Sequence, residues 1–123
     1  PDVDIVLCAS SGTEALEAVL AAIERGKTIA LANKEVLVMA GGIVTQAARD
    51  HDVAILPVDS EHNAIHQCLH GRPAAELKRL VLTASGGPFR GRSASDLEHV
   101  TAADALRHPT WQMGRKITID SAT

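Results

Sequence analysis

Short apolar runs alternate with amphipathic stretches along the first half of the chain. The apolar runs occupy residues 5–9, 28–31 and 54–58, which is the length and composition of buried β-strands. Between them, residues 13–25 and 34–51 place apolar side chains at helical spacing. Strands that alternate with helices on short loops predict a parallel α/β sheet with right-handed crossovers.

The two predicted helices have recognisable ends. Gly26 follows the first helix, where a residue in the left-handed conformation commonly closes a helix. Asn33 precedes the second helix and is a favoured N-cap residue. The pair Gly41-Gly42 interrupts the second helix at a cost of about 2 kcal/mol in helix propensity, which predicts close packing against a neighbour there.

The pattern changes after Gly71. Charged and Gly/Pro-rich segments surround one good strand at residues 79–84, and another apolar strand is expected at residues 117–120. We therefore expect a domain boundary near Asp59.

Both ends of the chain predict an excerpt of a longer protein. The first residue is Pro1, not an initiator methionine, and the last residues have the sequence of a helix cap with no helix after it.

Composition argues against several classes of partner. The 123 residues carry a net charge of −3, with both signs mixed along the chain, so we expect no nucleic acid and no membrane as partners. No apolar run is long enough to span a membrane. Cys8 and Cys68 form no paired pattern and lie in apolar surroundings, which predicts reduced core residues of a cytoplasmic protein.

Asp59-Ser60-Glu61, directly after the third predicted strand, is the most informative segment. On an extended backbone, residues i and i+2 project to the same side, so the carboxylates of Asp59 and Glu61 can converge. Two such carboxylates suit Mg²⁺ or Mn²⁺, completed by water and substrate. The alternative is a solvated turn in which Ser60 caps the next helix.

His62, His66 and His70 follow at helical spacing and form one column. Adjacent pairs fit a Zn²⁺ site. We favour the alternative, in which they are solvated side chains beside the apolar face of the helix.

Four further positions have candidate chemistry, each with a simpler alternative. Lys34 lies in the first turn of a helix, against the helix dipole, which hints at a functional lysine, but on this feature alone we slightly favour a surface lysine that is paired with Glu35 or solvated. Ser85 lies in a glycine-rich turn that suits a phosphate, or is only a tight connection. The segment 108–114 contains the sole tryptophan, which either covers a ligand or pins the loop to the core. Ser121 adds a hydroxyl to an anion site or caps a helix.

The order of these motifs is more specific than any one of them. ALANKE, LPVDSEHNAI, ASGGPFRG, HPTWQMGRK and ITIDSAT, in this succession, resemble the 1-deoxy-D-xylulose 5-phosphate reductoisomerase family of the non-mevalonate isoprenoid pathway. The resemblance covers nearly the whole chain and corresponds to the middle of that enzyme.

The resemblance implies a fold and a reaction. The fold is α/β, in which the end of a Rossmann-like NADPH-binding domain, residues 1–58, leads into an α/β (α+β-type) catalytic domain, residues 59–123, incomplete at both ends. The implied reaction isomerises 1-deoxy-D-xylulose 5-phosphate and reduces the product with NADPH to 2-C-methyl-D-erythritol 4-phosphate. The implied cofactors are NADPH and Mg²⁺ or Mn²⁺, and the implied assembly is a homodimer of the full-length protein.

The resemblance also implies roles for single residues. The implied metal ligands are Asp59 and Glu61. The implied catalytic residues are Lys34, Asp59, Glu61 and His108. The implied substrate contacts are Ser60, Glu61, Ser85, His108, Trp111 and Ser121. The implied cofactor contacts are Asn33, Lys34, Glu35, Met113 and Gly114.

The chain departs from the family pattern at three positions. Val36 replaces the usual serine, Ala84 a common glycine, and Thr110 a common asparagine whose loss affects a substrate contact most directly. The chain contains no G-x-G-x-x-G fingerprint and ends before the family's third metal carboxylate. Another NAD(P)-linked oxidoreductase and a non-catalytic phosphate-ligand domain therefore stay open as alternatives.

Overall fold

The computed structural model describes residues 2–84 and 86–121. By internal packing the chain forms two compact units, Pro1–Leu82 and Thr83–Thr123, and each is described by itself. The predicted boundary at Asp59 concerns the two domains of the family, and it stays a prediction.

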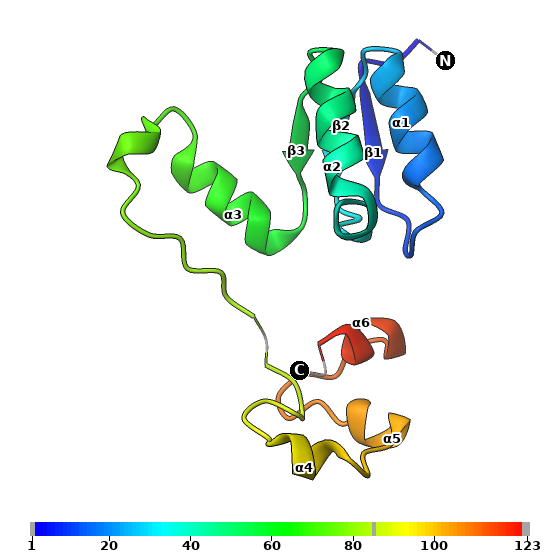
Figure 1. Ribbon diagram of the computed structural model, residues 1–123, viewed down its shortest axis with the longest axis vertical. Helices are drawn as coiled ribbons and strands as arrows, with labels where there is room; N and C mark the ends of the chain where they lie inside the picture. The colour runs from blue at the N-terminus through cyan, green and yellow to red at the C-terminus, as the bar shows by residue number, and fades with distance from the viewer. Residues whose placement is uncertain (1, 85, 122–123) are drawn as a thin grey trace. The chain divides into compact units, whose positions relative to one another are not determined.

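The first unit is a three-stranded parallel sheet with its connecting helices (Figure 1). The strands lie side by side in the order β1-β2-β3, with Ile5 opposite Thr28 and Ile29 opposite Ile55. This confirms the predicted parallel α/β fold. In chain order, the elements are β1 (Ile5–Cys8), α1 (Leu16–Glu24), β2 (Thr28–Leu31), α2 (Glu35–Asp50), β3 (Ile55–Pro57) and α3 (Ser60–Leu69).

The core lies between one face of the sheet and the helices α1 and α2, which pack on each other (Figure 1). Side chains alternate along a strand, so Cys8 points into this core while Ile5 and Leu7 are exposed on the other face. The buried apolar residues are Cys8, Val19, Ala22, Ile23, Ile29, Leu31, Val36, Ala40, Val44 and Ala48.

The predicted helix ends are confirmed. Gly26 has φ = 67° and follows α1, a conformation that favours glycine. The side-chain oxygen Oδ1 of Asn33 accepts a hydrogen bond from the backbone N–H of Val36 at 3.2 Å, so Asn33 satisfies a free donor at the start of α2 from one residue before the N-cap position, Lys34.

The predicted close packing at Gly41-Gly42 is wrong. A Cβ at Gly42 would meet nothing within 4 Å, and one at Gly41 would meet only Leu37 at 3.9 Å. Instead, α2 kinks at Ala40 (φ −139°, ψ 28°), and the hydroxyl of Thr45 donates to the Gly41 carbonyl at 2.7 Å. The glycines therefore accompany a bend in the helix.

After α3 the chain forms short helices that are joined by irregular segments. The single-turn helix η1 (Ala74–Glu76) belongs to the first unit, and α4 (Ala94–Leu97), α5 (Ala102–Ala105) and α6 (Arg115–Asp120) belong to the second. Capping boxes begin both α4, where Ser93 pairs with Asp96, and α5, where Thr101 pairs with Asp104.

Two predicted strands are absent from the described part of the chain. Residues 79–84 form no strand, and residues 117–120 lie in α6. A strand needs a neighbour for its backbone hydrogen bonds, and the described residues offer these segments none. Leu80, Val81 and Leu82 are consequently more than half exposed.

The prediction for the cysteines is half correct. Cys8 is buried, whereas Cys68 is exposed on α3, a helix without any buried residue. Among the helices of residues 2–84 and 86–121, none has the length and apolar character needed to cross a membrane.

Candidate functional site at the carboxyl edge of the sheet

The loops that follow the three strands meet at one edge of the sheet. The strands are parallel, so their carboxyl ends lie together, which is where α/β folds commonly bind ligands. The backbone N–H of Asn33 donates to the Cys8 carbonyl at 3.1 Å, and that of Val58 donates to the Leu31 carbonyl at 2.9 Å. These bonds hold Lys34 and Asp59, which follow β2 and β3, on neighbouring loops.

The buried side chain of Asn33 joins the loop after β2 to the loop after β1. Asn33 is 2% exposed, and its side-chain amide donates to the carbonyls of Ser10, at 2.9 Å, and Gly12, at 2.7 Å. Both amide hydrogens are therefore used within the protein. The structure gives Asn33 a positioning role beside Lys34 and Glu35, while the cofactor contacts of these three residues stay predictions.

Asp59 is the N-cap of α3. The prediction that Asp59 and Glu61 converge because both lie on extended backbone is therefore wrong. The strand β3 ends at Pro57, and Ser60 and Glu61 already lie in the first turn of the helix. The alternative in which Ser60 is the cap is wrong too, because Asp59 Oδ1 accepts the hydrogen bond from the His62 backbone at 3.0 Å. The Ser60 hydroxyl instead donates to Glu61 Oε2 at 2.9 Å.

The Asp59 carboxyl is ionised at neutral pH. Burial pushes its pKa upward, but hydrogen bonds from the backbone and ring of His62, together with the positive charges of His62 and Lys34, outweigh burial and lower its pKa. Lys34 lies on the loop next to that of Asp59, and its charge is the smallest of these causes. The sequence-predicted substrate lysine and the first predicted metal ligand are thus electrostatic neighbours.

Cys8 lies at the end of β1, near the same edge. Burial raises the pKa of its thiol, a hydrogen bond from Ser10 lowers it, and the charge of Glu35 raises it, with a net increase. Cys8 is accordingly a neutral core residue at physiological pH.

The donor set at the start of α3 fits a hard divalent cation. Asp59 and Glu61 offer carboxylate oxygens only, and the Asp59 side chain is 13% exposed, so it is partly shielded from water. Within residues 2–84 and 86–121, no group of three or more His, Cys, Asp or Glu side chains is placed to hold a metal. Two protein ligands suit Mg²⁺, which keeps several waters.

The second unit contains the candidates of the segment 108–114. His108 Nδ1 accepts hydrogen bonds from the backbone N–H groups of Thr110 and Trp111, and Trp111 is 56% exposed. The carbonyls of Met113 and Gly114 accept the Thr118 hydroxyl at 3.3 and 2.9 Å, which ties the end of this segment to α6. Ligand contacts of these residues stay predictions.

The serine candidates are less informative. Ser121 lies at the C-terminal end of α6, not after a strand, and its hydroxyl donates to the Ile117 carbonyl at 2.5 Å. Ser85 lies outside the described residues.

His62 and His66 of α3 and His70, which directly follows it, are exposed, as we favoured. The rings of His66 and His70 lie 5.7 Å apart, centroid to centroid, while His62 pairs with Asp59. This partner of Asp59 was missed at the sequence level, although a D-x-x-H spacing across a helix start was the available signal.

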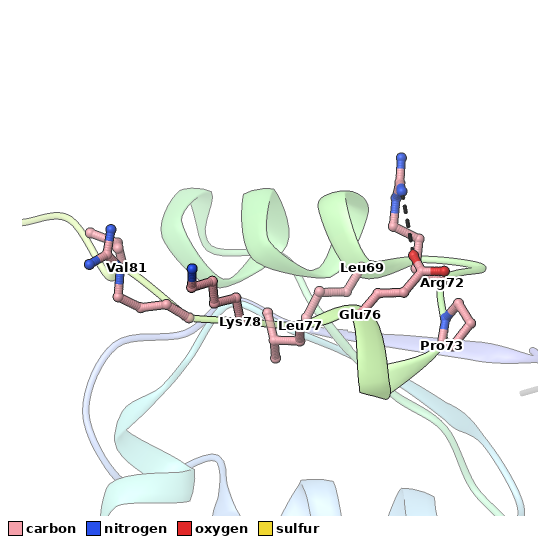
Figure 2. A pocket seen from close by; sticks show the side chains of 8 residues that line it. Leu69, Arg72, Pro73, Glu76, Leu77, Lys78 and Val81 are labelled. Atoms are coloured by element: carbon pink, nitrogen blue, oxygen red, sulfur yellow. Dashed lines mark ion pairs between the residues drawn. The ribbon is translucent and has the colours of Figure 1, made fainter.

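A pocket of about 590 Å³ lies elsewhere, beside the end of α3 (Figure 2). Its wall includes the ion pair of Arg72 and Glu76, at 3.8 Å, and the apolar side chains of Leu69, Leu77 and Val81. None of the predicted site residues lines it. It adjoins the extended segment that lacks a strand partner, and we do not assign it to the site.

Fold and site together define an α/β protein with a candidate ligand site at the carboxyl edge of a parallel sheet, where Lys34 and Asp59 lie on neighbouring loops and Glu61 lies in the first turn of α3. Comparison with protein families gives two matches, both to the same enzyme. Residues 1–41 match the family 1-deoxy-D-xylulose 5-phosphate reductoisomerase, and residues 55–123 match the C-terminal domain of the same enzyme. The chain belongs to the 1-deoxy-D-xylulose 5-phosphate reductoisomerase family.

Individual relatives agree with this assignment. The 1-deoxy-D-xylulose 5-phosphate reductoisomerases of Chlamydia trachomatis serovar L2 and of a Geobacillus species are each 58% identical over all 123 residues. A crystal structure of DOX-P reductoisomerase in complex with NADPH, fosmidomycin and magnesium matches 98% of the chain at 47% identity with a TM-score of 0.76. The Zymomonas mobilis enzyme in complex with NADPH matches 97% at 49% identity with a TM-score of 0.74. The chain spans about a third of the length of these proteins, 32% for the first three and 30% for the last.

Proposed function

We propose that this chain is the central part of an enzyme that converts 1-deoxy-D-xylulose 5-phosphate to 2-C-methyl-D-erythritol 4-phosphate with NADPH and a divalent cation. The observation that carries the proposal is the arrangement of Lys34 and Asp59 on neighbouring loops, with Glu61 in the following helical turn. Related structures contain NADPH and magnesium, and we propose that the enzyme of which this chain is a part uses both.

Each residue has a task in this proposal. Asp59 and Glu61 hold Mg²⁺ or Mn²⁺ at the start of α3, and the cation, when bound, stabilises negative charge on the substrate oxygens. Lys34 is exposed and contributes a positive charge at the same edge, where it orients the anionic substrate. The Ser60 hydroxyl, next to both carboxylates, contacts the substrate.

The remaining assignments complete the proposal. Residues 1–58 end the NADPH-binding domain, with Asn33 and Glu35 at the seam between nucleotide and substrate and Met113 and Gly114 as further cofactor contacts. Residues 59–123 begin the catalytic domain, in which Ser85 and Ser121 bind phosphate and His108 and Trp111 cover the substrate. The full-length enzyme acts as a cytoplasmic homodimer.

Product analysis tests the proposal. The full-length protein is incubated with 1-deoxy-D-xylulose 5-phosphate, NADPH and Mg²⁺, and the sugar phosphates are identified by ³¹P and ¹³C NMR. We expect 2-C-methyl-D-erythritol 4-phosphate in an amount equal to the NADPH oxidised. Binding of the sugar phosphate without turnover would support the non-catalytic alternative, and oxidation of NADPH only with other carbonyl substrates would support another oxidoreductase.

A further inference from the structure

The structure divides the three histidines of the column between the two ends of α3. His62 lies in the first turn of the helix, where its ring Nδ1 is 2.6 Å from Asp59 Oδ1. His66 and His70 lie at the other end of the helix, with their ring centres 5.7 Å apart. Only the second pair is therefore left for a ligand that two imidazole rings share.

The backbone of the last turn sets the spacing of this pair. The N–H of His70 donates to the His66 carbonyl at 2.9 Å, so the two residues keep the helical i, i+4 relation although His70 is the C-cap. Side chains in that relation lie on one face of the helix, one above the other. Two imidazoles whose nitrogens lie about 2.0 Å from a shared cation have ring centres about 5 Å apart. A small side-chain rotation brings the observed 5.7 Å to that value.

Both rings are accessible to a ligand. His66 and His70 are exposed, and among residues 2–84 and 86–121 neither ring makes a hydrogen bond or an ion pair. Cys68 is two residues from each histidine and therefore lies on a different side of the helix. The pair thus offers a metal ion two imidazole nitrogens, and water fills the remaining positions.

The end of the helix favours a cation at this place. The negative end of the helix dipole lies at the C-terminal end of α3. Arg72 is the only charged side chain between Glu61 and Glu76 in the sequence, and it is ion-paired with Glu76 at 3.8 Å. Two further cations, Lys78 and Arg79, line the pocket beside α3, which neither histidine lines.

Imidazole nitrogens select a different class of cation from the carboxylates at the start of α3. Imidazole suits Zn²⁺, Ni²⁺ and Cu²⁺, whereas Mg²⁺ prefers oxygen ligands. We propose that His66 and His70 form a site for a borderline transition-metal ion such as Zn²⁺ or Ni²⁺. This site is separate from the candidate site of Asp59 and Glu61, and it does not rest on the proposed function.

Four variants test the pair and its spacing. His66→Gln and His70→Gln each replace one imidazole with a neutral polar side chain. The double variant Cys68→His/His70→Gln keeps two histidines but places them two residues apart, where they do not share a face. His99→Gln, which changes an exposed histidine of the second unit, is the matched control.

Zn²⁺ and Ni²⁺ are titrated into the full-length protein, without an affinity tag, by isothermal titration calorimetry. Excess Mg²⁺ is present to occupy the carboxylate site. We expect the parent and His99→Gln to bind with equal affinity. Both single variants and the double variant should bind at least about tenfold more weakly, because a lone imidazole lacks the second, intramolecular bond to the ion. Far-UV circular dichroism checks that the helix content is unchanged.

The histidine rings themselves identify the site. In long-range ¹H–¹⁵N correlation spectra, Zn²⁺ should shift the ring signals of His66 and His70 together and leave those of His99 in place, each assigned by its loss in the corresponding variant. Parent-like affinity in His66→Gln or in the double variant, or displacement of Zn²⁺ by Mg²⁺, would overturn the proposal. None of these readouts requires turnover, so the result is independent of reductoisomerase activity.

Discussion

One carboxylate oxygen of Asp59 binds His62 twice. Oδ1 accepts the backbone N–H of His62 at 3.0 Å and lies 2.6 Å from its ring Nδ1. Among the described residues, both hydrogen bonds go to Oδ1, which leaves Oδ2 for a cation. The start of α3 therefore orients the Asp59 carboxylate through Oδ1 alone, and Oδ2 keeps its capacity to bind a cation.

This orientation predicts the effect of Asp59→Asn in the full-length protein. Asparagine is an equally good N-cap, so α3 should form and thermal stability without metal should change by less than about 1 kcal/mol. The lost negative charge should weaken Mn²⁺ binding by at least about tenfold, measured by electron paramagnetic resonance of free Mn²⁺. Glu98→Gln, an exposed carboxylate at the end of α4, is the control and should bind Mn²⁺ as the parent does. Equal affinity in Asp59→Asn would remove it from the metal site.

The neighbouring Lys34 predicts a change in titration. Its charge helps to lower the pKa of Asp59 from the ordinary value of 3.8, so Lys34→Gln should raise that pKa. A lowered pKa in the folded state means that ionised Asp59 stabilises the fold above its ordinary pKa, and that this stability is lost as pH falls through the lowered value. The variant should therefore lose less stability on acidification. Carboxyl ¹³C titration measures the pKa, and an unchanged value would mean that the two groups do not interact.

The capping box of α5 gives a second acid-sensitive element. Hydrogen bonds from the side chain and backbone of Thr101, opposed by desolvation and assisted by Arg107, lower the pKa of Asp104 from 3.8 to about 2. Its contribution to stability is present above 3.8 and is lost as pH falls toward about 2. Thr101→Val removes the hydroxyl, so the pKa of Asp104 should move upward in a ¹³C titration. If it stays at about 2, the hydroxyl of Thr101 is not its cause.

The internal position of Asn33 predicts a large cost on truncation. Asn33→Ala leaves two carbonyls, of Ser10 and Gly12, and the N–H of Val36 without their partner, which should lower the free energy of unfolding by about 3 kcal/mol. Asn63→Ala is the matched control, because the Asn63 side chain makes a single hydrogen bond to the backbone, to the Pro57 carbonyl at 2.7 Å. This substitution should lower the free energy of unfolding by about 1 kcal/mol. Urea unfolding measures both. Equal costs would show that the edge of the sheet does not depend on Asn33.

The sequence predicts elements whose partners are close along the chain. The sheet of β1, β2 and β3 follows from apolar runs and turn residues, since each strand pairs with the next through a short crossover. Residues 79–84 have an equally apolar pattern but no strand to pair with in the described chain, and local pattern does not reveal this. Thr118 illustrates the same limit. It lies in α6, where we expected an apolar strand, and its hydroxyl donates to the Met113 and Gly114 carbonyls.

The candidate site could be proposed from residue types, but its geometry could not be predicted from the sequence. The carboxylates of Asp59 and Glu61 suggest a cation site by their chemistry, whereas their position at a helix start depends on where β3 ends. The bonds between Asn33 and the loop after β1 join residues distant in sequence, so no local spacing indicates them.

Turnover of Glu61→Gln in the full-length protein tests the central claim most directly. The substitution keeps the size of the side chain and the hydrogen bond that Ser60 donates to it, and removes only the charge. With 1-deoxy-D-xylulose 5-phosphate, NADPH and saturating Mg²⁺, we expect NADPH oxidation to fall by more than about a hundredfold, while Glu98→Gln stays at the parent rate. A rate for Glu61→Gln within about threefold of the parent would contradict the assignment of this edge as the catalytic metal site.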